Sequence, residues 1–395
     1  MTLTRRLFDE SSHLFDFKAT VLSVIPTDDD TLSVVLDATA FFPEGGGQAS
    51  DTGTLAGYPI IDVQETDGVI YHTVNAEASA ISAGDTVVGH LDREVRLRKM
   101  QNHSGEHIIS GIVHHLYGYT NVGFHLGSGD VTLDFDGGLT REQLDAIEDE
   151  ANRIVAACLP VVAYYPTPEV LSTLTYRAKL DLTENVRMVE IGQGEDMMDR
   201  CACCAPHVDN TGEIGIIKLL DFIHYKGGVR IHMLCGLDAL EDYRRRYTDV
   251  AMLASRLSVK QTELVAGFDR LVSEIEEKKQ IIFSLRQKIQ EMTLAALPET
   301  EGSLCVFEET GDANAMRRLL NEAVGKCRKL CGVFSGDDEG GYRYFIGRGD
   351  PTIDLKQHNK EISAALNARG GGSSEMLQGR SGATRAQIEA FFENF

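Results

Sequence analysis

The sequence predicts an α+β protein with several cores, because segments of different period follow one another along its 395 residues. Short alternating segments come first, mixed helical and strand-like segments follow, and a long heptad pattern precedes a last mixed section. At roughly 150 residues per domain, this length suits two or three domains. The patterns predict a small β-barrel domain over 1–92, an α/β domain over 93–240, a helical arm over 241–297 and a C-terminal α/β domain over 298–395.

The first section contains short, β-branched segments separated by Gly and Asp, which is the pattern of half-buried strands and turns. Some eighty residues of such strands favour a small barrel or a compact sheet. The expected strands cover 19–25, 31–37, 60–65, 69–74 and 85–92.

The second section mixes helices and strands. Its periodicity predicts a helix over 94–116 and another over 141–157, for which Thr140 is a suitable N-cap. Strands are expected at 186–191, 213–225 and 229–234.

The third section carries a heptad repeat that Pro298 ends. We expect a long helix or a helical hairpin that forms a coiled-coil-like arm, although an ordinary surface helix of a bundle has the same pattern. The core positions are Leu264, Phe268, Leu271, Ile275, Ile282, Leu285, Ile289 and Met292, with Lys278 in one slot that should be apolar.

The last section is expected to follow a β-α-β-β-α order. Its strands are predicted at 304–308, 331–336 and 342–347, its helices at 313–326 and 354–368, and a Gly-rich loop at 369–383.

The charge balance excludes some classes of protein. With 38 Lys and Arg against 60 Asp and Glu, the net charge of −22 excludes a polycation that coats nucleic acid. No apolar run reaches the length of a membrane span, and the N-terminal residues show no secretory signal. The eight cysteines are too sparse for a disulfide scaffold, so we expect reduced thiols or metal ligands in a cytoplasmic protein.

Two clusters have the residue types of a metal site. His103 and His107 are four residues apart in a predicted helix, which places both imidazoles on one face. Three thiols and an imidazole follow within seven residues, at 201–207, and thiolate with imidazole favours Zn²⁺. A chance pair of helical histidines, a redox thiol pair and a set of buried cysteines are the alternatives.

Spacing alone leaves the identity of the thiol ligand open. Cys203 and His207 are four residues apart, while Cys201 and Cys204 are equally available.

A third feature is the segment 41–53, whose three consecutive glycines permit close approach of the backbone to a ligand. A long hairpin turn would have the same composition.

These blocks, in this order, resemble the editing half of alanyl-tRNA synthetase and the freestanding alanyl-tRNA editing proteins. FFPEGGGQASDTG, NHSGEH, CCAPHV and TGEIG each resemble a family motif, and GGGSSEMLQGRSGA resembles the Gly-rich end of the synthetase's C-terminal domain. The resemblance covers nearly the whole chain and leaves no room for an aminoacylation core.

The resemblance implies a set of site residues. It assigns the zinc ligands to His103, His107, Cys203 and His207, and the substrate-binding loop to Glu44, Gly45, Gly46, Gly47, Gln48 and Asp51.

The chain also departs from the family pattern. The family's Gly-Gly-Thr is Cys204-Ala205-Pro206, the Thr often preceding the second His is Glu106, and a strand Gln is replaced around Phe124-His125. These changes suggest a divergent subgroup and bear on amino-acid discrimination more than on hydrolysis.

The reaction implied is zinc-dependent hydrolysis of the aminoacyl ester on tRNA(Ala) mischarged with Ser or Gly. The zinc ion has either three firm ligands and a weaker fourth, or a closed set of four. Glu106 is a candidate general base, or else a solvent-facing helix carboxylate, because it lies one residue off the His face. His125, expected on a strand of the pocket, is a second candidate base, or else it packs or caps.

Binding of tRNA by so acidic a chain requires local basic patches, although each patch has an ordinary solvated face as its alternative. We also expect that the chain can form a homodimer through the arm or the C-terminal domain. The alternatives are an inactive zinc-stabilised protein that binds tRNA or dimerises, and a redox or metal sensor that uses the three clustered thiols. The expected nucleic-acid-binding residues are Arg98, Lys99, Arg369 and Arg380, within patches that also contain Arg93, Arg96, 244–246, Lys278, Lys279, Arg286, Lys288, Arg317, Arg318, Lys326, Arg328 and Lys329.

Overall fold

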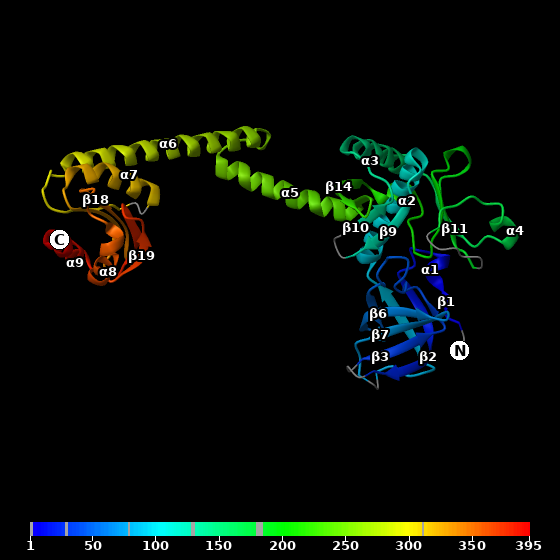
Figure 1. Ribbon diagram of the computed structural model, residues 1–395. Helices are drawn as coiled ribbons and strands as arrows, with labels where there is room; N and C mark the ends of the chain where they lie inside the picture. The colour runs from blue at the N-terminus through cyan, green and yellow to red at the C-terminus, as the bar shows by residue number, and fades with distance from the viewer. Residues whose placement is uncertain (1–2, 28–30, 78–79, 128–130, 179–184, 310–311) are drawn as a thin grey trace. The chain divides into compact units, whose positions relative to one another are not determined.

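A computed structural model describes residues 3–27, 31–77, 80–127, 131–178, 185–309 and 312–395. The chain divides into two compact units, Met1–Met252 and Leu253–Phe395. Each unit combines helices with its own sheets, so the predicted mixed α+β class is confirmed (Figure 1). The finer division into four domains stays a prediction. Among the described residues, no helix combines the length and apolarity needed to cross a membrane.

The first unit begins with a closed barrel, as the short strands predict. Its core is filled by inward-facing residues such as Val34, Val63 and Ile70, which are fully buried. A short parallel pair and one helical turn lie at the N-terminal end, formed by β1 (Arg5–Arg6), β4 (Ala38–Thr39) and α1 (Leu7–Glu10). The barrel order is β2 (Asp16–Pro26), β3 (Leu32–Leu36), β7 (Val69–Val74), β6 (Tyr58–Thr66), β5 (Gly53–Leu55) and β8 (Thr86–Leu91).

His72 is a fully buried histidine in this barrel, hydrogen-bonded to Thr39 Oγ1 at 2.8 Å and to the carbonyl of Val34 at 3.0 Å. Burial lowers the pKa of His72 to about 4. Below about pH 6.5 the unfolded chain takes up a proton that the folded barrel excludes. The free energy of unfolding should therefore fall as the pH decreases from about 6.5 to about 4.

We expect His72 to cost about 2 kcal/mol of stability between pH 7 and pH 5. The variant His72→Gln should lose this part of the pH dependence, as measured by urea unfolding at the two pH values. The same substitution at the exposed His115 should leave the dependence unchanged. An identical slope in His72→Gln and the parent would contradict this assignment.

The second half of the first unit packs two helices on a four-stranded antiparallel sheet. The long helix α2 (Arg93–Tyr117) starts where the Asp92 side chain accepts hydrogen bonds from two backbone amides and ends at Gly118, whose φ is 70°. Its middle is buried on nearly every side, because the sheet, α3 (Arg141–Ala156) and β13 (Asp199–Ala202) all contact it (Figure 1). The sheet order is β14 (Ile217–Tyr225), β15 (Gly228–Cys235), β10 (Val131–Phe135) and β9 (Asn121–Leu126).

A smaller antiparallel sheet lies in the same unit and leads to the cysteine cluster. Its order is β11 (Val161–Tyr164), β12 (Met188–Ile191) and β13 (Asp199–Ala202), with α4 (Pro168–Leu171) following β11. The patterns predicted β12, β14 and β15, but did not indicate β9, β10, β11 or β13. The first residues of the predicted strand 213–225 instead belong to the 3₁₀ turn Thr211–Ile214.

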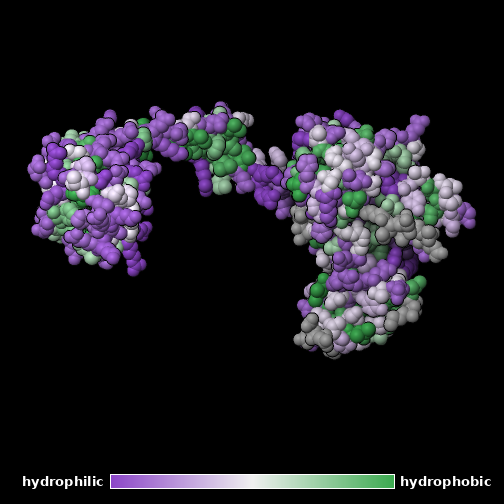
Figure 2. All heavy atoms as spheres, in the orientation of Figure 1, coloured by the Kyte–Doolittle hydropathy of each residue, from purple (hydrophilic) through white to green (hydrophobic). Residues whose placement is uncertain are grey.

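Two long helices follow, α5 (Gly236–Leu257) and α6 (Leu264–Ala296), and α6 ends just before Pro298, as expected. Hydrophobic residues lie on the surface of α6, including Phe268, Ile275 and Ile289, which are each about half exposed (Figure 2). The long helix is therefore present, whereas its pairing into a coiled coil stays a prediction.

The second unit ends in a five-stranded sheet with helices on both faces. The expected Gly-rich loop at 369–383 is wrong in its larger part, because most of these residues form the hairpin of β19 (Ala368–Gly372) and β20 (Met376–Ser381). Glycine is needed there since a Cβ at Gly370 would lie 2.6 Å from the Tyr344 hydroxyl. The sheet order is β16 (Leu304–Phe307), β17 (Leu330–Asp337), β18 (Gly341–Arg348), β20 (Met376–Ser381) and β19 (Ala368–Gly372), with α7 (Ala313–Ala323), α8 (Leu355–Ala365) and α9 (Arg385–Asn394).

Candidate functional site

Four side chains from two distant segments meet in the first unit. His103 and His107 lie one turn apart on α2, and Cys203 and His207 come from the segment after β13. The sulfur of Cys203 is 3.5 Å from His103 Nε2 and 3.3 Å from His207 Nε2. One nitrogen or sulfur atom from each of the four residues lies within 4.8 Å of the others. The three histidines are buried and Cys203 is partly exposed, and this cluster could hold one metal ion.

Polar groups lie beside the other ring nitrogens of the histidines, and those beside His103 and His207 form hydrogen bonds that fix the ring orientation. His103 Nδ1 is 2.9 Å from Gln48 Oε1, and His207 Nδ1 is 3.0 Å from the Ser104 hydroxyl. His107 Nδ1 lies 3.4 Å from Asp199 Oδ2. Such partners are typical of metal-binding histidines, because they select the tautomer and hold the ring toward the ion.

The loop that carries Cys203 and His207 is held by Arg187. The guanidinium donates to the carbonyl oxygens of Cys203 and Ala205, at 3.2 and 2.8 Å, and its Nε lies 3.1 Å from Asp9 Oδ1. The Cys203 amide in turn donates to the Arg187 carbonyl at 3.0 Å. The ligand loop therefore has a fixed position relative to β12.

Spacing did not decide which of Cys201, Cys203 and Cys204 is the thiol ligand. Of these three, the structure brings only Cys203 together with all three histidines. Cys201 lies in a neighbouring group with His107 and Asp199, where Arg177 donates two hydrogen bonds of 2.7 Å to the Asp199 carboxylate. Cys204 is exposed.

Burial shifts the acid–base behaviour of the cluster. It raises the pKa of the Cys203 thiol well above the ordinary value and lowers the pKa of His207, to which the neighbouring His107 and His103 also contribute. A cation in the cluster would favour the thiolate and the neutral imidazoles, since these are the forms that bind metals.

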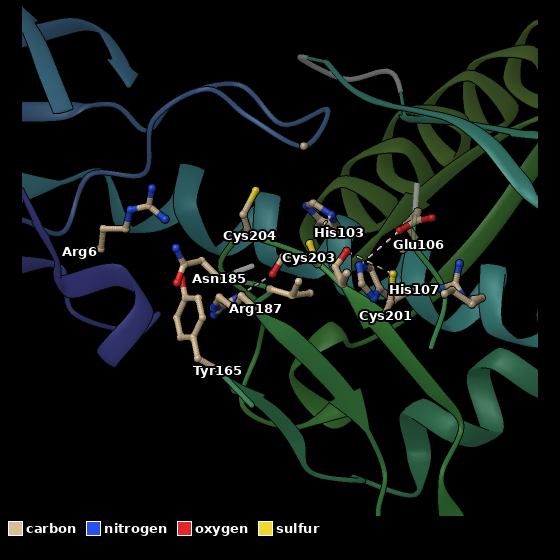
Figure 3. A pocket seen from close by; sticks show the side chains of 15 residues that line it. Arg6, His103, Glu106, His107, Tyr165, Asn185, Arg187, Cys201, Cys203 and Cys204 are labelled. Atoms are coloured by element: carbon tan, nitrogen blue, oxygen red, sulfur yellow. Dashed lines mark hydrogen bonds and ion pairs between the residues drawn. The ribbon is translucent and has the colours of Figure 1, made fainter. Parts of the chain in front are cut away.

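A pocket opens beside the cluster (Figure 3). His103, Glu106 and His107 lie at one end of it, and Cys203 and Cys204 lie between them and a second group of polar residues. The pocket is lined by Arg6, Gly46, His103, Glu106, His107, Tyr165, Arg177, Ala178, Asn185, Val186, Arg187, Cys201, Ala202, Cys203 and Cys204.

Glu106 is buried, so the alternative of a solvent-facing helix carboxylate is wrong. Its Oε1 accepts hydrogen bonds from the Ser110 hydroxyl at 2.7 Å and from Asn121 Nδ2 at 2.6 Å, and its Oε2 lies 3.7 Å from His107 Nε2. Periodicity could not reveal this, because the partner Asn121 comes from β9, which the hydrophobic pattern did not indicate.

The structure does not bring His125 into the pocket. His125 is an exposed residue of β9, and its neighbour Phe124 packs its ring on His103 with centroids 4.8 Å apart. Successive side chains of a strand point to opposite faces, so Phe124 occupies the position toward the cluster. No pattern in the sequence distinguished these two residues.

The glycine loop supplies residues to the site unevenly. Gly46 lines the pocket, and Gln48 contacts His103 as described above. Gly47 has a φ of 84°, and a Cβ there would lie 2.7 Å from the Phe124 carbonyl oxygen, so glycine is required. Gly45 closes a tight turn by exchanging backbone hydrogen bonds with Gln48. Glu44 is exposed and accepts a hydrogen bond from Gln64.

Asp51 does not line the pocket. Its carboxylate forms a buried ion pair with Arg96, whose guanidinium also donates to the carbonyls of Ser12 and Ala40. Asp51 also accepts a hydrogen bond from the Phe42 amide at 2.8 Å. The pair therefore ties the glycine loop to α2, and Arg96 is wrong as part of an exposed basic patch because its side chain is fully buried.

The four expected nucleic-acid-binding residues fall into two groups. Arg98 is paired with Glu94, Asp238 and Glu241, and Lys99 donates to the carbonyl of Ser50, so carboxylates or carbonyls already occupy both cations. By contrast, Arg369 and Arg380 are exposed and lie opposite each other on β19 and β20. Arg343, which the patterns did not single out, is opposite Arg380 on β18 and completes a row of three exposed arginines.

Comparisons with known proteins show which families this chain is similar to. The family model described as tRNA synthetases class II (A) matches residues 9–95, and the model of the threonyl and alanyl tRNA synthetase second additional domain matches residues 186–232. An alanyl-tRNA editing protein AlaX-L of Pyrococcus horikoshii is 26% identical over 99% of this chain and 97% of its own length.

Alanine–tRNA ligases are also similar. The ligase of Ignicoccus hospitalis is 30% identical over 80% of this chain, and that of Pyrobaculum neutrophilum is 31% identical over 95% of it. These matches span only 35% and 42% of the two ligases. The chain is therefore a relative of the alanyl-tRNA editing proteins and of the corresponding part of alanine–tRNA ligase.

Proposed function

We propose that this protein hydrolyses the ester of tRNA(Ala) mischarged with serine or glycine, using Zn²⁺ held by His103, His107, Cys203 and His207. The observation that carries the proposal is the set of one thiol and three buried imidazoles beside a pocket. The set fits Zn²⁺, because thiolate and imidazole are its preferred ligands and the other nitrogens of His103 and His207 are hydrogen-bonded to Gln48 and Ser104.

The residues of the pocket have distinct tasks in this proposal. Bound Zn²⁺ would supply Lewis acidity toward the ester carbonyl or a water molecule. Glu106 is the proposed general base, since it lines the pocket. Its Oε1 accepts the hydrogen bonds from Ser110 and Asn121, and its Oε2 lies on the side of the metal cluster. His125 lies outside the pocket and receives no role. Arg187 and Gln48 position the ligand loop and the His103 ring.

Two sequence-based alternatives receive less support. A redox thiol pair needs two thiols that face each other, whereas the Cys203 sulfur contacts two imidazole nitrogens and Cys201 groups with His107 and Asp199. An inactive tRNA-binding protein would not require a buried carboxylate in the pocket, since burial of a charged group is costly.

The proposal predicts selective deacylation. The zinc-loaded protein should hydrolyse Ser-tRNA(Ala) much faster than Ala-tRNA(Ala), because one hydrogen bond to the seryl hydroxyl is worth about 1–3 kcal/mol. Release of labelled amino acid from the two charged tRNAs measures this, and a Gly-tRNA(Ala) sample tests the second substrate. Equal background loss from all three would refute the hydrolase and favour the inactive tRNA-binding alternative.

The arginine row of β18, β20 and β19 is the proposed phosphate-binding surface of the second unit. Replacing Arg380 by alanine should weaken tRNA binding and reduce the slope of log affinity against log salt by about one. The matched control is Arg98→Ala, whose cation is already paired with carboxylates. An unchanged salt slope in Arg380→Ala would remove the row from the tRNA interface.

A further inference from the structure

The pocket has a second end that the proposed hydrolysis does not use. Tyr165, Asn185 and Arg187 lie together there, and Arg6 lies beyond them, whereas His103 and Glu106 lie at the opposite end (Figure 3). All these residues belong to the first unit. We call the group Arg6, Tyr165 and Asn185 the tyrosine end.

Strand pairing explains why these residues meet. Tyr164 of β11 is opposite Met188 of β12. The next residues outward are Tyr165, which follows β11, and Arg187, which precedes β12, so both lie at the same end of these paired strands. Asn185 is two residues before Arg187. Because Arg187 also binds the loop of Cys203, the tyrosine end is connected rigidly to the metal cluster.

The Tyr165 side chain is held by a hydrogen bond at its hydroxyl and is about half exposed to solvent. The hydroxyl donates to Asp9 Oδ2 at 2.9 Å, and Asp9 also contacts Arg187. Even so, 49% of Tyr165 is exposed. An aromatic ring that is held in place and accessible to solvent offers a stacking surface for a nucleobase.

Asn185 adds a second feature of a nucleotide site. Arg6 is already paired with Glu65, so its guanidinium borders this end of the pocket and is given no ligand. Asn185 is exposed beside Tyr165 and carries an amide that can pair with N6 and N7 of adenine.

We propose that the tyrosine end binds the 3′-terminal adenosine of RNA, with the base stacked on Tyr165 and the adenine edge at Asn185. This inference rests on the proposed function, because the ester of an aminoacyl-tRNA is carried by the ribose of that nucleoside. One substrate then occupies both ends of the pocket at once, with the nucleoside at the tyrosine end and the ester near Glu106 and the metal cluster.

The test uses the full chain and an uncharged RNA hairpin whose terminal adenine is replaced by 2-aminopurine. The chain has no tryptophan, so the fluorescence of the base analogue is measured without protein background at its excitation wavelength. Stacking on Tyr165 should quench it in the parent and in Tyr165→Phe, which keeps the ring. The quench should be lost in Tyr165→Ala and retained in Tyr243→Ala, which removes an exposed tyrosine of α5.

A second measurement separates binding from chemistry. With seryl-RNA hairpins, Tyr165→Ala should raise KM about tenfold and leave kcat within about twofold, because base stacking is lost but the ester end is intact. In Asn185→Ala, uncharged hairpins that end in guanosine should compete as well as those that end in adenosine.

The outcomes distinguish the two proposals. Equal quenching in Tyr165→Ala and the parent, or binding of the hairpin by the parent without quenching, would overturn the adenosine site. A quench that depends on Tyr165, in a protein that hydrolyses no charged tRNA, would support the site and contradict the proposed hydrolysis.

Discussion

Replacing Cys203 by alanine is expected to remove bound zinc and to reduce hydrolysis of mischarged tRNA by more than about 100-fold. The reason is geometric, because Cys203 is the thiol that lies within 3.5 Å of both His103 Nε2 and His207 Nε2. Zinc content by atomic emission and release of serine from Ser-tRNA(Ala) are measured on the same preparation.

The neighbouring thiols provide matched controls for this variant. Cys204→Ala, one residue away and exposed, should keep its zinc, and so should Cys201→Ala. Glu106→Gln should also keep zinc but lose rate, which separates a general base from a ligand. Full zinc stoichiometry in Cys203→Ala would reassign the thiol ligand to Cys201 or Cys204.

Replacing Asp51 by alanine is expected to lower the free energy of unfolding by about 3–5 kcal/mol, because it leaves the buried Arg96 cation without its counter-charge. The measurement is urea unfolding of the full chain followed by circular dichroism. The loss of stability should affect the contact between the glycine loop and α2, because Asp51 accepts hydrogen bonds both from Arg96 of α2 and from the Phe42 amide.

A double variant tests whether the cost comes from the unpaired charge. Asp51→Leu combined with Arg96→Met should recover much of the loss, because apolar replacement of a whole buried ion pair is often neutral. The exposed Arg5–Glu10 pair is the control, and Glu10→Ala should change stability little. A small effect of Asp51→Ala would show that the pair does not anchor the glycine loop.

The sequence predicted five of the six barrel strands and the course of α2 because these depend on local period and residue type. The set of His103, His107, Cys203 and His207 was instead implied by the family resemblance, since spacing left the thiol ligand open. The carboxylate of Asp92 starts α2 and Gly118 ends it, and both are local signals. The His103–His107 pair followed from helical spacing alone.

Features that depend on distant partners could not be predicted in the same way. Burial of Glu106 requires Asn121 from β9, a strand whose pattern Gly123 interrupts. Asp51 was expected to bind a ligand. Its buried ion pair with Arg96, 45 residues away, shows instead that it joins the glycine loop to α2. The β19–β20 hairpin was read as a loop because glycine is usually depleted in strands.

The central claim is that one zinc ion in the cluster of His103, His107, Cys203 and His207 supports hydrolysis of mischarged tRNA. The most direct measurement removes metal with a chelator, returns Zn²⁺ in steps and follows bound zinc and Ser-tRNA(Ala) hydrolysis together. The account predicts that activity returns in proportion to zinc and saturates at one ion per chain. Full hydrolysis by the metal-free protein, or zinc binding without any hydrolysis, would contradict it.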